Sequence, residues 1–171
     1  MAFNLAINND IAVITFDDGK VNAVGFELIQ QFNDALDEAE QNAKAVVLHG
    51  GEGKFCGGFD LSVMKADDKA KQHELVSKGA ELIVRLYSFP LPVVVAAEGH
   101  SIAMGAIMLL AADLRIGKEA VKAGFIDAAV PQEHVLATAM GYAEKLKMLP
   151  RQSFAESKLQ LRKETIAKMQ A

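Results

Sequence analysis

The stretch that decides the fold is Lys54-Phe55-Cys56-Gly57-Gly58-Phe59-Asp60. It follows a short apolar run, Ala45 to Leu48, and it precedes a segment with a helical pattern that begins at Leu61. A strand, a glycine-rich turn and the start of a helix leave backbone N–H groups without partners in the chain. Such a turn can hold a negatively charged oxygen.

A second turn of the same kind is Glu98-Gly99-His100-Ser101-Ile102-Ala103-Met104-Gly105, which follows the strand-like run Val93 to Ala97. An oxyanion hole needs two convergent backbone donors aimed at one carbonyl oxygen. Two such turns can supply one donor each, and their small side chains suit close approach of a ligand to the backbone. The other reading of this pattern is that the glycines only permit tight turns.

Composition describes an ordinary globular protein of one domain. The chain has 171 residues, of which 51% are hydrophobic and 23% are charged. A net charge of −4 without a Lys/Arg run argues against nucleic-acid binding. The single cysteine excludes an intrachain disulfide framework and cannot by itself build a zinc site. We expect no signal peptide, no membrane span and a cytoplasmic location.

Strands alternate with helices along the chain, which predicts an α/β sheet. Strands are expected at 5–7 and 11–16, joined by a turn at 8–10, and at 45–48, 93–97 and 113–117, with an extended segment at 125–130. Helices are expected from about 25 to 39, across 75–86, over 103–112, briefly at 119–123, and over 133–148 and 153–169. The helix at 103–112 carries almost no charge, so we expect it to be buried centrally.

Two other chemistries fit parts of the sequence. A phosphate loop at His49 to Lys54 lacks the required glycine–lysine spacing. A nucleophile elbow at Gly99 to Ala103 would make Ser101 a serine nucleophile, which also needs a histidine and usually an acid. His100 adjoins Ser101 in sequence, and that position does not give the required side-chain geometry. Serine hydrolysis through Ser101 stays open as an alternative.

Four segments, in order and with matching spacing, resemble the successive signatures of the crotonase (enoyl-CoA hydratase/isomerase) family: 20–24, 45–48 with 54–61, 92–99 and 112–116. The resemblance implies a crotonase-like ββα spiral core with C-terminal helices. It also implies an acyl-CoA thioester as substrate, in fatty acid metabolism, and assembly as a homotrimer or a dimer of trimers. The chemistry needs no metal and no redox cofactor.

The same resemblance assigns site residues. The two oxyanion donors would be the backbone N–H groups of Phe59 and Met104. Residues at the CoA site would be Asn22, Ala23, Val24, Gly58, Phe154 and Lys158, the last two on a C-terminal helix that often serves a neighbouring subunit. A thioester carbonyl held by two N–H groups makes its α-carbon acidic, and loss of one donor costs about 3–4 kcal/mol.

The chain departs from the family pattern at the second turn. Hydratases of the family carry a glutamate where this chain has Ile107, which cannot transfer a proton. Ala103 and Met104 replace glycines, and we expect Met104 to narrow or shape the pocket. An isomerase-like or lyase reaction is therefore favoured over a two-carboxylate hydration. Structural roles are expected for Asp60, Glu98 and Cys56.

A second departure follows Gly117. The next residues, 118–127, resemble a part of the family found well downstream, so we expect an omitted internal segment there. Residues 1–117 would be the crotonase-like core and residues 118–171 the C-terminal helical region. A natural deletion, the alternative, would expose apolar surface on the 103–112 helix. It would favour a non-catalytic acyl-CoA-binding or scaffold protein.

Overall fold

The structure is a computed structural model that describes residues 2–118 and 124–171. Its elements are β1 (Ala2–Asn8), β2 (Ile11–Asp17), α1 (Phe26–Asn42), β3 (Ala45–His49), β4 (Lys54–Cys56), α2 (Leu61–Met64), α3 (Lys69–Ser88), β5 (Val93–Ala97), β6 (His100–Ser101), α4 (Met104–Ala111), β7 (Leu114–Gly117), β8 (Ala128–Ala129), a 3-10 turn (Gln132–His134), α5 (Val135–Leu146) and α6 (Arg151–Met169). The brief helix expected at 119–123 lies outside the described residues.

The main sheet has six strands in the order β1-β2-β3-β5-β7-β8. β1 and β2 form an antiparallel hairpin, and each later neighbour pairs in parallel. The hairpin turn places Asn9 and Asp10 at φ values of 50° and 63°, a left-handed conformation that Asn and Asp tolerate better than most residues. The predicted α/β sheet and its hairpin are therefore confirmed.

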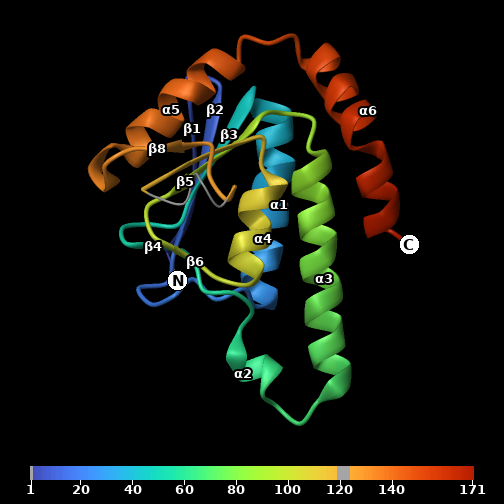
Figure 1. Ribbon diagram of the computed structural model, residues 1–171. Helices are drawn as coiled ribbons and strands as arrows, with labels where there is room; N and C mark the ends of the chain where they lie inside the picture. The colour runs from blue at the N-terminus through green and yellow to red at the C-terminus, as the bar shows by residue number, and fades with distance from the viewer. Residues whose placement is uncertain (1, 119–123) are drawn as a thin grey trace.

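Helices cover both faces of this sheet (Figure 1). Alternate residues of a strand point to opposite faces. In β3, Val46 and Leu48 therefore join the larger core with α1, α3 and α4, whereas Ala45 and Val47 join the smaller core with α5. The fully apolar strands of the sequence follow from this burial on both sides.

An aromatic cluster fixes the start of the first glycine turn. The Phe16 ring lies edge-on to Phe32 at 4.9 Å and to Phe55 at 5.3 Å between ring centroids. Phe55 belongs to β4 and is fully buried. Such aromatic pairs add about 0.5–1.5 kcal/mol each beyond their buried area. The cluster thus anchors the strand that leads into Gly57 and Gly58.

A two-stranded sheet of β4 and β6, which the sequence does not predict, joins the two glycine turns. Lys54 pairs with His100 and Cys56 with Ser101, in parallel. The Ile102 N–H continues the ladder by donating to the Cys56 carbonyl at 2.8 Å. The turns that follow these strands therefore lie side by side.

Helix α4 is buried on one side only, so the prediction of a centrally buried helix is wrong. Met108 and Leu109 are buried against the core, whereas Ile107 and Leu110 are 49% and 47% exposed. The helix packs on α3, β4 and β6, which leaves its other face uncovered by the described residues. Within the segment expected to be extended at 125–130, Ala128–Ala129 pair with β7 as β8.

No helix within 2–118 or 124–171 combines the length and the apolar character needed to cross a bilayer.

Candidate active site

Gly58 is the point where the two glycine turns touch. It has a φ of +99°, and a Cβ atom added there would lie 3.2 Å from the Ala103 Cβ and 3.3 Å from the Ile102 carbonyl oxygen. The same position is 3.7 Å from the Met104 nitrogen. Only glycine combines this backbone conformation with such close approach. Because the Phe59 nitrogen is bonded to the Gly58 carbonyl carbon, both predicted donors flank this one glycine.

The Phe59 amide points away from the neighbouring strand segment. Val24 and Phe59 form a parallel bridge, in which Val24 donates to the Gly58 carbonyl at 2.7 Å and accepts from the Asp60 N–H at 3.0 Å. In a parallel bridge the residue between these two partners directs its own N–H to the other side. Phe59 is that residue, and its N–H has no acceptor among the described residues.

The Met104 amide is the first N–H of α4. Two N–H groups of the first turn that follows are used: Gly105 donates to Ile102 at 2.9 Å and Ile107 to Ala103 at 3.2 Å. Met104 itself has no hydrogen-bond acceptor in the described part of the chain. A helix N-terminus also carries a partial positive charge that favours an anion.

Ala103, the N-cap of α4, holds a strained backbone conformation. Its φ is 50° and its ψ is −115°, a region that side chains with a Cβ rarely adopt. This conformation turns the chain from β6 into α4 with the Met104 N–H at the helix start. Strain of this kind costs about 1–3 kcal/mol and concentrates at functional sites.

The side chains of Phe59 and Met104 pack together on α3. A Cβ atom on Gly79 would lie 2.5 Å from the Phe59 ring and 3.3 Å from the Met104 methyl carbon. Met104 is 3% exposed and belongs to the larger core. Apolar burial directs the Met104 side chain into this core, and its effect on the shape of a ligand pocket stays a prediction. The sequence signal for this packing was Gly79 on the apolar face of a helix.

Two residues beside the first turn have the structural roles predicted for them. Asp60 caps α2 by accepting a hydrogen bond from the Ser62 N–H at 2.8 Å. Cys56 is fully buried, and burial raises the pKa of its thiol to about 11. A carboxylate used as a cap and an un-ionised thiol are poor candidates for proton transfer or nucleophilic attack at this site.

Ser101 is not assembled into a catalytic triad. Its hydroxyl donates to the Gly99 carbonyl at 3.4 Å, and no histidine among the described residues hydrogen-bonds to it. His49 instead pairs with Glu98, with 2.9 Å between Nε2 and Oε1. The sequence analysis missed this pair, although His49 ends β3 and Glu98 follows the neighbouring strand β5. The pair braces the loops after β3 and β5 and lines a cavity of about 480 Å³.

The predicted CoA-site residues at 22–24 lie against the first turn. Asn22 is 1% exposed and Val24 is 1% exposed, whereas Ala23 is partly exposed. The Asn22 side chain is engaged with backbone groups of the protein, and Val24 bridges to Phe59. The structure thus brings 22–24, Gly58, Phe59 and Met104 together, and contact of this group with CoA stays a prediction.

Lys158 and Phe154 of α6 lie apart from that group. Phe154 lines a groove of about 680 Å³ with Lys44 and Pro92, at the amino ends of β3 and β5, whereas both glycine turns follow carboxyl ends. The Lys158 side chain is 3% exposed and its ammonium is 2.7 Å from the Asp113 carboxylate. Their contribution to a CoA site, in this chain or a neighbour, stays a prediction.

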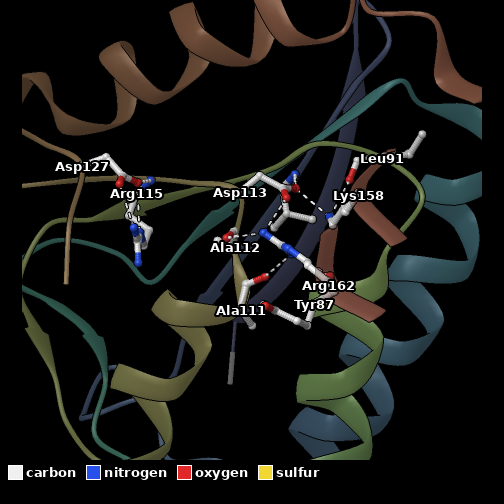
Figure 2. A network of polar contacts seen from close by, with 10 residues as sticks. Tyr87, Leu91, Ala111, Ala112, Asp113, Arg115, Asp127, Lys158 and Arg162 are labelled. Atoms are coloured by element: carbon white, nitrogen blue, oxygen red, sulfur yellow. Dashed lines mark hydrogen bonds and ion pairs between the residues drawn. The ribbon is translucent and has the colours of Figure 1, made fainter. Parts of the chain in front are cut away.

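Asp113 is the centre of a buried ionic network that docks α6 (Figure 2). Burial lowers the pKa of Lys158, and the charge of Asp113 opposes that shift. Arg162, one helical turn beyond Lys158, reaches Asp113 at 2.9 Å and donates to carbonyls at the ends of two helices, Tyr87 of α3 and Ala111 of α4. The sequence signal for this role was the pair of cations spaced four apart on one helix face.

No group of three His, Cys, Asp or Glu side chains within 2–118 and 124–171 is placed to hold a metal ion. The donor set at the paired turns consists of backbone N–H groups, which bind anionic oxygens rather than cations.

Comparisons with known proteins show the family of the chain. The family model described as Enoyl-CoA hydratase/isomerase matches residues 6–119. A probable enoyl-CoA hydratase from Rhodobacter capsulatus is 35% identical over 114 residues, covering 66% of this chain and 44% of that protein. A probable enoyl-CoA hydratase from Bacillus subtilis is 27% identical over 128 residues, covering 72% of this chain and 49% of that protein. The chain therefore spans about half the length of the curated relatives it matches.

Solved structures match across nearly the whole chain. An enoyl-CoA hydratase from Mycobacterium ulcerans superposes with a TM-score of 0.92 and 30% identity, covering 98% of this chain and 94% of that one. The human mitochondrial delta3-delta2-enoyl-CoA isomerase superposes with a TM-score of 0.91 at 21% identity, covering 98% and 85%, which supports the fold alone. The fold is thus crotonase-like, and the chain belongs to the enoyl-CoA hydratase/isomerase family.

Proposed function

We propose that the chain binds an acyl-CoA thioester and polarises its carbonyl with the backbone N–H groups of Phe59 and Met104. The observation that carries this proposal is the contact of the two turns at Gly58, which brings two N–H groups without acceptors among the described residues to either side of one glycine. Two such donors stabilise the oxygen of an enolate far better than water does, because they are already oriented.

The reaction that fits best is an isomerase-like shift of a double bond along the acyl chain. A carboxylate from the segment expected to be omitted after Gly117 would take a proton from C2 of a 3-enoyl thioester, which leaves a dienolate whose negative oxygen the two N–H groups bind. The same group, now protonated, would return that proton at C4 to give the 2-enoyl thioester. Hydration by two carboxylates is disfavoured, since Ile107 stands one helical turn beyond Ala103 and has no acidic group.

A second candidate is an acyl-CoA-binding protein without catalysis. Ile107 favours it, and so does Asp60, the carboxylate beside the first donor, which is engaged as the cap of α2. In this reading the oxyanion hole binds the thioester carbonyl and no group transfers a proton.

Calorimetric titration with a 3-enoyl-CoA, followed by a turnover assay on the same sample, separates these readings. Saturable binding with conversion to the 2-enoyl thioester supports the isomerase, and binding without conversion supports the non-catalytic protein. Absence of binding at millimolar acyl-CoA would contradict both. Gly58→Ala should weaken the binding by at least tenfold, since its Cβ would press on Ala103. Gly53→Ala is the matched control, because Gly53 has a φ of +74° but open space around it.

Trimeric assembly and a cytoplasmic location, which the resemblance and the composition predict, are part of the same proposal.

A further inference from the structure

Asn22 is a buried polar residue whose side chain hydrogen-bonds to the backbone of the first glycine turn. It is 1% exposed and has a left-handed φ of 55°. A buried amide group costs free energy unless its hydrogen bonds are made within the protein. The partners of Asn22 therefore indicate what the residue is for.

All of its hydrogen bonds go to backbone groups or to Asp18. The Nδ2 group donates to the carbonyls of Gly50 and Phe55, the latter at 3.0 Å. The Oδ1 atom accepts from the Asp18 N–H at 2.9 Å, and the Asn22 N–H donates to the Asp18 carboxylate at 2.9 Å. Both side-chain donors and the side-chain acceptor are thus engaged within the protein, which leaves no polar group of this side chain free for a ligand.

The backbone on either side of Asn22 is bonded to the first turn. Gly57 donates to the Val21 carbonyl at 2.7 Å, and Val24 donates to Gly58 at 2.7 Å while it accepts from Asp60. Together with the bond from Asn22 to Phe55, these contacts tie residues 21–24 to Gly57, Gly58 and Asp60 of the turn and leave out the Phe59 peptide N–H. That N–H is directed away from the segment because its neighbours on both sides are held.

We infer that Asn22 is a positioning residue, which sets the direction of the Phe59 N–H by fixing segment 21–24 against the glycine turn. The inference rests on the proposed function, because the Phe59 N–H matters only if it binds a thioester oxygen. It differs from a direct contact between Asn22 and CoA, since the Asn22 amide faces backbone carbonyls inside the protein.

Asn22→Gly tests this role without adding backbone strain, because glycine adopts a positive φ at little cost. Amide hydrogen exchange of the ligand-free protein should become at least tenfold faster at residues 57–60, with no change in the central strand β5. Asn9→Gly is the matched control: it makes the same replacement at a φ of 50°, in the exposed β1–β2 turn, and it should leave residues 57–60 unchanged. Unchanged exchange at 57–60 in Asn22→Gly would overturn the inference.

Ligand measurements distinguish positioning from CoA contact. A thioether analogue of the acyl-CoA lacks the carbonyl, so Asn22→Gly should change the Kd of this analogue by less than about threefold. With the thioester itself, the same variant should lower kcat, or the shift in carbonyl stretching frequency on binding, by about tenfold or more. The reverse pattern, weaker thioether binding with an unaltered thioester carbonyl, would assign Asn22 to CoA contact.

Two further results keep the outcomes separate. Asn22→Asp, which retains the acceptor and loses both donors, should reproduce the exchange and carbonyl effects if Asn22→Gly proves too unstable to measure. If the unsubstituted protein binds no acyl-CoA, the proposed function fails. If it binds and both variants keep the exchange rates and the carbonyl shift of the unsubstituted protein, only the positioning role fails.

Discussion

The Asp113 carboxylate lies 2.7 Å from the buried ammonium of Lys158 and 2.9 Å from the guanidinium of Arg162. One carboxylate thus compensates two cations from α6 at the point where α4 ends and β7 begins. Because Arg162 also binds carbonyls at the ends of α3 and α4, the network couples α6 to the helix whose first N–H is a proposed oxyanion donor.

Asp113→Asn should destabilise the protein by about 3 kcal/mol, because it leaves a buried ammonium without its counter-charge. Lys158→Met should cost much less, since Asp113 keeps Arg162 and the Val93 N–H as partners. Urea unfolding of the two variants measures both. Equal losses would contradict the central place of Asp113 in the network.

Ala103→Gly should stabilise the protein by about 1 kcal/mol, because glycine relieves the positive φ at the start of α4. Ala106→Gly, two residues into the same helix, is the control and should lose about 1 kcal/mol. Thermal unfolding compares them. If both glycine variants lose stability equally, Ala103 is not strained.

Asp127→Asn tests a pH dependence. Hydrogen bonds from Arg115, at 2.7 Å and 2.9 Å, hold the pKa of Asp127 below its ordinary value. A lowered carboxylate pKa gives stability that is present above the unfolded value of about 3.9 and is lost as the pH falls through the folded pKa. The variant should therefore melt at a lower temperature at pH 7, and its free energy of unfolding should fall by less than about 1 kcal/mol for this partly exposed pair.

The difference between Asp127→Asn and the unsubstituted protein should shrink as the pH falls below about 5. Asp67→Asn, at an exposed position, should alter the melting temperature little at any pH. The difference in melting temperature between Asp127→Asn and the unsubstituted protein could instead stay constant down to acid pH. That result would mean that the charge on Asp127 contributes nothing to the stability of the protein.

Cys56 should resist alkylation in the folded protein. Its thiol is fully buried and its pKa is raised to about 11, so the reactive thiolate is scarce at pH 8. Mass spectrometry after iodoacetamide treatment should find no adduct in buffer and complete labelling in urea. Rapid labelling in buffer would place the thiol at the surface and weaken its packing role.

The elements with long apolar patterns could be predicted from the sequence. The segments at 11–16, 45–48 and 93–97 became β2, β3 and β5. The last two are apolar throughout, as strands buried on both faces are, and the first is apolar except at Thr15. The pairing of β4 with β6 could not be predicted, since strands of three and two residues have no detectable period. Yet this small sheet is what brings the two turns together.

What the sequence could not predict at the site is which elements pack around a given side chain. A helix without charges looks buried all round, but exposure of Ile107 depends on which elements pack beside α4. The direction of Met104 depends on the space above Gly79, which no local pattern records. From the sequence alone, Lys158 could bind either a CoA phosphate or a carboxylate of the protein. The carboxylate of Asp113 lies next to it only in the folded chain.

The carbonyl stretching frequency of a bound, carbon-13-labelled acyl-CoA thioester tests the central claim most directly. Two N–H donors should lower that frequency relative to the free ligand. Replacing the amide of Phe59 or Met104 by an ester, which removes only the N–H, should abolish much of the shift, whereas an ester at Ile107, whose N–H serves the helix, should retain it. A thioester that binds with an unshifted carbonyl would contradict the oxyanion hole.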